Sequence, residues 1–129
     1  MSGTRNHSIF VSCQINSSED PLKIKTALFN VFPDLKFSVN DQQIIGKSSH
    51  TNSLSKISES IRSKKTAKTF ERILKKNIST NSTWFYLNKQ AAFVDTIAIC
   101  DEADESSLGP IKVVLEANDI EITIKSITS

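Results

Sequence analysis

The sequence has little cysteine and no long apolar run. Cys13 and Cys100 are the two cysteines among 129 residues, too few for a disulfide scaffold and unlike the ligand spacing of a zinc site. We therefore expect both to be buried as small apolar groups, with a regulatory thiol pair as the alternative. No apolar stretch is long enough to cross a bilayer, and no apolar signal core follows Met1. These absences predict a soluble, cytoplasmic protein without membrane contact.

Catalytic and ligand-binding motifs are also missing. His7 and His50 have no metal-ligating partner at a useful spacing, and the acidic loop at residues 101–107 lacks the glycine and the spacing of a calcium loop. Gly46-Lys47-Ser48 matches the end of a phosphate loop, but the earlier glycine of that loop is missing. The chain has no nucleophile elbow, protein-kinase signature or dinucleotide fingerprint. We expect no catalytic activity, metal or cofactor.

Length and composition are those of one globular domain. A chain of 129 residues can bury a single hydrophobic core. Its hydrophobic fraction of 38% and charged fraction of 23% exclude disordered and fibrous classes. We therefore expect one domain over residues 1–129, with residues 1–6 flexible.

Apolar periodicity predicts an α+β fold. Ile9, Val11 and Cys13 alternate with polar residues, as in a half-buried strand. Asp20 and Pro21 are typical of a helix start, and apolar residues three and four apart follow them. The predicted strands are 8–15, 36–40, 43–47, 83–88 and 111–116, and the predicted helices are 20–32, 53–62 and 65–76.

The end of the chain fits two periods. Ile120, Ile122 and Ile124 alternate as in a strand, whereas Ile120, Ile124 and Ile127 would line a short helix capped by Asn118 or Asp119. We favour the helix.

Asn88, Lys89 and Gln90 directly follow the predicted strand 83–88. Their amide and ammonium groups therefore lie where a strand ends or bends. One interpretation is RNA contact, in which the amides meet base edges and the ammonium meets a phosphate. The alternative is that Asn88 and Gln90 hydrogen-bond the main chain at a bend or a dimer interface.

Positive charge is concentrated in one segment. From Arg62 to Lys76 there are seven basic residues and one acid, a net +6, whereas the remainder has nine basic and thirteen acidic residues, a net −4. On a helical wheel of about 100° per residue for the predicted helix 65–76 and the residue before it, five of the other cations fall within roughly 80° of Lys68: Lys64, Lys65, Arg72, Lys75 and Lys76. The segment holds Arg62, Lys64, Lys65, Lys68, Arg72, Lys75 and Lys76.

Such a basic face is suited to a phosphate backbone. The alternatives are a solvated face, an anionic membrane or an acidic protein partner. Because no exposed aromatic residue is interleaved with the cations, contact with phosphates or duplex shape is favoured over base reading. The candidate RNA-binding residues are the seven basic ones together with Asn88, Lys89 and Gln90.

Three motifs occur in a characteristic order and spacing: Asp20-Pro21 before Asn30-Val31-Phe32-Pro33, then Leu87-Asn88-Lys89-Gln90-Ala91-Ala92, then Leu108-Gly109-Pro110-Ile111. Together they closely resemble an uncharacterised archaeal family, number 0201 among the uncharacterised protein families, over roughly residues 7–125. The resemblance implies a single-domain α+β sandwich similar to the fifth large-subunit ribosomal protein, with a mainly antiparallel sheet and helices on one face. It also implies a homodimer and, by fold analogy, RNA as a partner.

The chain departs from the family pattern at several positions. Lys65-Thr66-Ala67-Lys68 replaces an Asp-Thr-Ala-Arg run, Ser107 replaces a proline, and Asp95 replaces a glycine. The first departure makes the basic segment more positive than the pattern requires.

Three function classes follow. The first is a non-catalytic RNA-binding module that contacts the phosphate backbone through the basic helix. The second is a structural or regulatory homodimer that binds an acidic protein partner through the same face. The third is an enzyme acting on a phosphorylated small molecule, for which the sequence nominates no base or nucleophile. The expected homodimer would cover apolar side chains that one sheet of this size leaves uncovered; these are Phe10, Trp84, Phe85 and Phe93.

Overall fold

A computed structural model describes residues 7–40, 42–102 and 108–129. The expected flexible start and most of the expected acidic loop lie outside these residues. The elements, in chain order, are β1 (His7–Gln14), α1 (Pro21–Val31), β2 (Lys36–Val39), β3 (Gln43–Ser48), a 3-10 turn η1 (Thr51–Leu54), α2 (Ser55–Ser63), α3 (Ala67–Lys76), β4 (Ser82–Leu87), α4 (Lys89–Phe93), β5 (Ile99–Cys100), β6 (Ile111–Ala117) and α5 (Ile120–Thr128).

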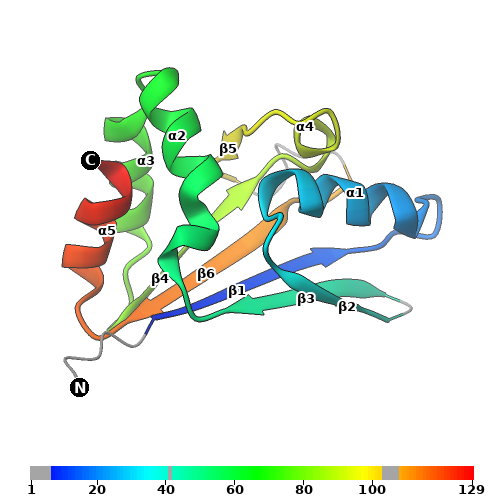
Figure 1. The fold of residues 1–129 in the computed structure, drawn as a ribbon, viewed down its shortest axis with the longest axis horizontal. Helices are drawn as coiled ribbons and strands as arrows, with labels where there is room; N and C mark the ends of the chain where they lie inside the picture. The colour runs from blue at the N-terminus through cyan, green and yellow to red at the C-terminus, as the bar shows by residue number, and fades with distance from the viewer. Residues whose placement is uncertain (1–6, 41, 103–107) are drawn as a thin grey trace.

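The strands form one antiparallel sheet in the order β2-β3-β1-β6-β4-β5. β1 is central: Val11 lies opposite Gly46 of β3 on one side and Val113 of β6 on the other. The α-helices of the described residues lie on one side of the sheet (Figure 1). This confirms the predicted α+β class with a mainly antiparallel sheet. No helix in the described ranges is long and apolar enough to cross a membrane.

The core lies between the helices and one face of the sheet. Val11, Phe85 and Val113 point into it and are fully buried, because inward-facing residues alternate along each strand. Phe70 of α3 meets Phe85 edge to face, with ring centroids 4.9 Å apart and planes at 83°. Burying a side chain of this kind contributes about 1.5–3 kcal/mol. Both cysteines are free and buried, as predicted from their number.

The other face of the sheet carries side chains that are half-buried or exposed. We call this surface the open face. Its side chains come from alternate positions of β2, β3, β1, β6 and β4: Lys36, Ser38, Ile45, Lys47, Ser8, Phe10, Ser12, Lys112, Val114, Glu116, Ser82, Trp84 and Tyr86.

Gly46 belongs to β3 and not to a phosphate loop. A Cβ atom on this residue would lie 2.6 Å from two ring atoms of Phe37, which is closer than real side chains approach. Glycine is therefore needed here because the Phe37 ring packs over the strand. This explains the Gly46-Lys47-Ser48 sequence without a phosphate ligand.

Most predicted elements agree with the structure to within about two residues at each end, the usual uncertainty of element boundaries. The predicted helix at the chain end is α5, and the Asp119 carboxylate caps it by accepting a hydrogen bond from the Ile122 amide, 3.2 Å away. Two short elements were not predicted, α4 and β5. The predicted helix 53–62 divides into the 3-10 turn and α2.

The predicted helix 65–76 begins two residues later, at Ala67, because Lys65 lies in the turn that ends α2. Its φ of +57° is left-handed, and the Thr66 amide donates to the Ile61 carbonyl at 2.9 Å while the Lys65 amide donates to the Arg62 carbonyl at 3.2 Å. This is a Schellman motif, in which glycine usually occupies the left-handed position. The basic segment therefore spans two helices.

The same motif ends α4, with Asp95 at a φ of +59°. The Thr96 amide donates to the Ala91 carbonyl at 2.9 Å, and the Asp95 amide donates to the Ala92 carbonyl at 3.0 Å. Asp95 stands where the family pattern has a glycine, which this backbone conformation accounts for.

We expect Lys65→Gly to raise the free energy of unfolding by about 0.5–1 kcal/mol, because it removes a Cβ atom from a left-handed residue and loses part of that gain to unfolded-chain entropy. Lys65→Gln is the control, because it removes the same charge and keeps the Cβ atom. Urea denaturation measures both. A glycine variant no more stable than the glutamine variant would contradict the assignment of strain to this residue.

Candidate nucleic-acid interface

The basic residues occupy three consecutive pieces of backbone. Arg62 lies in the last turn of α2, Lys64 and Lys65 lie in the connection, and the others lie on α3. All seven side chains are exposed. We call the exposed cations of α3 the basic surface; they are Lys68, Arg72, Lys75 and Lys76.

Several of these cations have partners. Lys76 Nζ lies 2.6 Å from Asp101 Oδ1, and Lys75 Nζ lies 3.6 Å from a carboxylate oxygen of Glu71, one turn earlier. Lys64 Nζ donates to the Ile97 carbonyl at 2.7 Å. Arg62 donates to the Ser129 carbonyl at 3.3 Å. These contacts are exposed, so each contributes little to stability.

Lys68 and Arg72 differ from this group. Within the described part of the chain, neither has an acidic group within salt-bridge distance. Lys68 is the second residue of α3, where the positive end of the helix dipole disfavours a cation, while Lys75 and Lys76 lie in the last turn, where it favours one. The stability of α3 therefore does not explain why a lysine occupies position 68.

Asp101 faces the C-terminal end of the basic surface. The hydrogen bond from Lys76 is the main cause that holds the pKa of the Asp101 carboxyl below its usual range. Desolvation opposes this, and the charges of Lys76 and then Arg72 add to the lowering. Asp101 therefore offsets charge near Lys76, and Lys68 lies at the other end of the helix.

Asn88 caps α4. Its side-chain oxygen accepts a hydrogen bond from the Ala91 amide at 2.8 Å, which satisfies one of the free donors in the first turn of the helix. This is the main-chain alternative that the sequence left open for Asn88. Gln90 is exposed on the same helix. Thus the three consecutive residues have three different environments.

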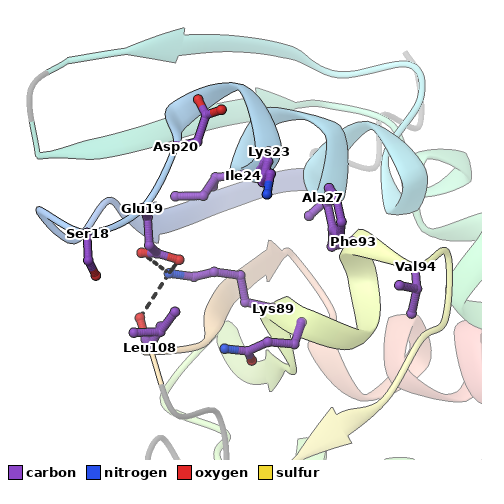
Figure 2. A pocket seen from close by; sticks show the side chains of 11 residues that line it. Ser18, Glu19, Asp20, Lys23, Ile24, Ala27, Lys89, Phe93, Val94 and Leu108 are labelled. Carbon is purple, nitrogen blue, oxygen red and sulfur yellow. Dashed lines mark hydrogen bonds and ion pairs between the residues drawn. The ribbon is translucent and has the colours of Figure 1, made fainter.

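Lys89 is buried. Its side chain is 5% exposed, and the ammonium lies 3.0 and 3.2 Å from the two carboxylate oxygens of Glu19. It also donates to the Leu108 carbonyl at 2.9 Å (Figure 2) and to the Gln14 carbonyl at 3.0 Å. A phosphate contact, as the sequence suggested, would require these bonds to break. The geometry favours a structural role for Lys89.

Glu19 is held ionised by its surroundings. Burial opposes ionisation, but hydrogen bonds from the Asn16 amide at 3.0 Å, the Asn16 side chain at 2.8 Å and the Lys89 ammonium together keep the pKa of the Glu19 carboxyl below its usual range. Sequence analysis missed Glu19, because the Ser-Glu-Asp-Pro run around it already has an explanation as a helix start.

A cavity of about 500 Å³ adjoins the Lys89–Glu19 pair, between α1 and α4 (Figure 2). Its lining is mainly apolar and includes Ile24, Ala27, Phe93, Val94 and Leu108. The Lys89 ammonium in its wall is fully engaged by protein acceptors, so it is not available as a nucleophile or a base. The described residues contain no group of three or more side chains placed to bind a metal ion.

Comparison with known proteins defines the class. A family model described as RNA binding matches residues 8–125. A UPF0201 protein of Methanothermobacter thermautotrophicus is 38% identical over 110 residues, which cover 85% of this chain and 82% of the relative. Another, from Sulfurisphaera tokodaii, is 36% identical over 124 residues, or 93% of this chain and 86% of the relative.

Solved structures with a similar fold include proteins of the same family. The crystal structure of a UPF0201 protein from Methanococcus jannaschii superposes with a TM-score of 0.81 at 29% identity, covering 94% of this chain and 92% of that one. The chain belongs to the UPF0201 family, which confirms the family resemblance drawn from its motifs.

We expect Glu19→Gln to lower the free energy of unfolding by about 3 kcal/mol at neutral pH, because it leaves the Lys89 ammonium buried without its counter-charge. The Glu19 pKa is depressed by folding, so its contribution is complete above the unfolded-state value of about 4.3. The contribution is lost as the pH falls through the folded-state pKa. The difference between wild type and variant should therefore shrink on acidification.

Glu59→Gln is the matched control, because Glu59 is exposed on α2. It should change the free energy of unfolding by no more than about 0.5 kcal/mol. Urea denaturation at several pH values measures both variants. A gap between wild type and Glu19→Gln that stays constant with pH would contradict the ionised pair.

Proposed function

We propose that this protein is a non-catalytic, cytoplasmic RNA-binding module that contacts the phosphate backbone through the basic surface of α3. Lys68 carries the proposal. It is exposed at a helix end that disfavours cations, and among the described residues no acidic group lies within salt-bridge distance of it. An RNA phosphate would supply the missing counter-charge. The family description, RNA binding, supports the same partner.

The chemistry of α3 suits phosphates better than bases. Its aromatic residue, Phe70, is 1% exposed and packs in the core, so the helix has no ring on which a base could stack. Lysine and arginine neutralise phosphates without reading sequence. Lys64 and Lys65 adjoin the start of the helix and extend the same charge.

An acidic protein partner is the alternative for this surface. It would meet the same cations, and its binding would also weaken with salt. The two partners differ in valence and shape, so polyglutamate serves as the comparison ligand in the test below. The proposed likeness to the fifth large-subunit ribosomal protein, itself an RNA-binding protein, favours RNA by analogy.

We also propose that the chain is one domain that forms a homodimer. Phe85 does not contribute to the exposed apolar load, since it is fully buried. Phe93 and Val94 are 42% and 68% exposed, and they lie with Leu108 around the cavity between α1 and α4. We place the dimer contact there, because clustered exposed apolar side chains are typical of an interface.

Removing Lys68 and Arg72 charges tests the RNA proposal. Engagement of three or four cations implies a slope of log affinity against log salt of roughly −2 to −3.5 per protomer. Lys68→Gln/Arg72→Gln should weaken binding to many RNA sequences alike and flatten this slope by about one to two units. Fluorescence anisotropy over a salt series measures it.

Lys23→Gln/Lys125→Gln is the control, because it removes the same charge from exposed positions on α1 and α5. It should leave the slope nearly unchanged. If both double variants give the same slope of log affinity against log salt, the basic surface is a solvated face and does not contact RNA. Tighter binding to polyglutamate than to RNA at matched charge would favour the acidic protein partner.

For the homodimer, sedimentation at tens of micromolar should show a dimer, a range in which the association equilibrium is readily measured. Val94→Glu should yield monomer, because it buries a charge in the proposed contact. Val39→Glu is the matched control, since Val39 is 48% exposed at the edge strand β2. A monomeric wild type would defeat the proposal, and dissociation by the control would move the contact to the sheet edge.

A further inference from the structure

We propose that the open face of the sheet binds single-stranded RNA, with unpaired bases stacked on Phe10, Trp84 and Tyr86 and phosphates held by Lys47 and Lys112. This surface lies on the side of the sheet away from the helices (Figure 1). The inference rests on RNA being the partner, as proposed above, but it does not depend on the basic surface of α3.

The strand register aligns the aromatic side chains. Phe10 of β1 lies opposite Val114 of β6, which lies opposite Trp84 of β4. Tyr86 follows two residues later on the same face, with its ring centroid 4.9 Å from that of Trp84 and the planes at 58°. All three aromatic side chains are half-buried. The water-facing side of an antiparallel sheet is usually polar, so this row of rings needs another reason, and base stacking supplies one.

Lysines accompany the rings. Lys47 Nζ lies 5.8 Å from the centroid of the Phe10 ring, and Lys112 Nζ lies 5.2 Å from that of Trp84. Lys36 lies directly opposite Lys47 on the neighbouring strand. Like charges in this position repel, and an anion across both would offset the repulsion. Exposed cation–π contacts are weak, so each ammonium can turn from its ring to a phosphate.

Hydroxyl groups surround one end of this row. A depression of about 470 Å³ at that end is lined by several residues of the open face, including Phe10, Lys47, Ser8, Ser82 and Glu116. Serine can donate to or accept from a base edge. The Glu116 carboxylate is suited to accept from an exocyclic amino group, as acidic side chains do with cytosine.

Charge decides between RNA and a second copy of this chain. Among the charged side chains of the open face, Lys36, Lys47 and Lys112 are basic and Glu116 is acidic. Two copies of this face in contact would bring an excess of positive charge together, which disfavours the pairing. A single strand of RNA carries the opposite charge. Its unpaired bases expose the ring faces that a duplex hides.

Trp84 makes the test direct, because it is the one tryptophan of the chain. Oligouridylate of about twelve nucleotides, within the site sizes of stacking surfaces, should quench its fluorescence saturably, and an RNA duplex of equal length should not. Phe10→Leu and Tyr86→Leu keep apolar volume but remove a ring. Each should weaken oligouridylate binding, measured by anisotropy, about 5- to 100-fold.

Phe29→Leu is the matched control, because Phe29 is 43% exposed on α1 and its ring already packs edge to face on Phe37. It should bind oligouridylate as wild type does, and urea denaturation should show that all three leucine variants fold. Equal losses for Phe10→Leu and Phe29→Leu, or binding with unchanged Trp84 fluorescence, would overturn the proposal. Dissociation of a dimer by Phe10→Leu would instead identify a second copy as the occupant, and would also overturn it.

Failure here is distinguishable from failure of the proposed function. RNA binding that depends on Lys68 and Arg72 without any quenching of Trp84 would leave the proposed function standing and defeat this inference. No measurable affinity for single-stranded or duplex RNA at low salt would defeat both.

Discussion

The buried ammonium of Lys89 constrains the arrangement of the chain around it. Removing such a charge from water costs several kcal/mol, and this cost is offset only when every donor finds an acceptor. Here the acceptors come from the end of β1, the turn before α1 and the residue two positions before Pro110. Glu19 lies 70 residues away in sequence. The pair therefore fixes where α1 and α4 meet, and with them the cavity between these helices.

The sheet separates two kinds of surface. On the helix side, Phe70 and Phe85 join α3 to β4, so the cations of α3 point away from the sheet. On the other side, rings and lysines share the open face. Because the sheet and the helix layer lie between the two surfaces, one RNA strand in contact with both would have to pass around the edge of the sheet. Otherwise, the two surfaces would take separate RNA segments.

The sequence contains the period of every long element, but not the contacts between distant ones. α4 has five residues, too few to show a helical period, and its one sequence signal is Asn88 as a cap. The turn at Lys65 that ends α2 could not be predicted from the sequence, because lysine rarely adopts a left-handed backbone. The burial of Lys89 depends on Glu19, and the row from Phe10 to Trp84 depends on strand order. Neither can be obtained from local spacing, whereas the exposure of Lys68 and Arg72 follows from the amphipathic period of their helix.

The buried thiols make the opening of the sheet chemically visible. Burial raises the pKa of Cys13 to about 11, although the nearby Lys89 charge opposes the rise, so the reactive thiolate is scarce in the folded chain. Cys13 lies in the central strand, between β3 and β6, whereas Cys100 lies in a two-residue strand at the sheet edge. A thiol reagent would therefore modify Cys100 on local opening of the sheet edge, but would modify Cys13 only when the central strands separate. The rate of Cys100 modification would therefore report local opening of the sheet edge, and the rate of Cys13 modification would report global unfolding.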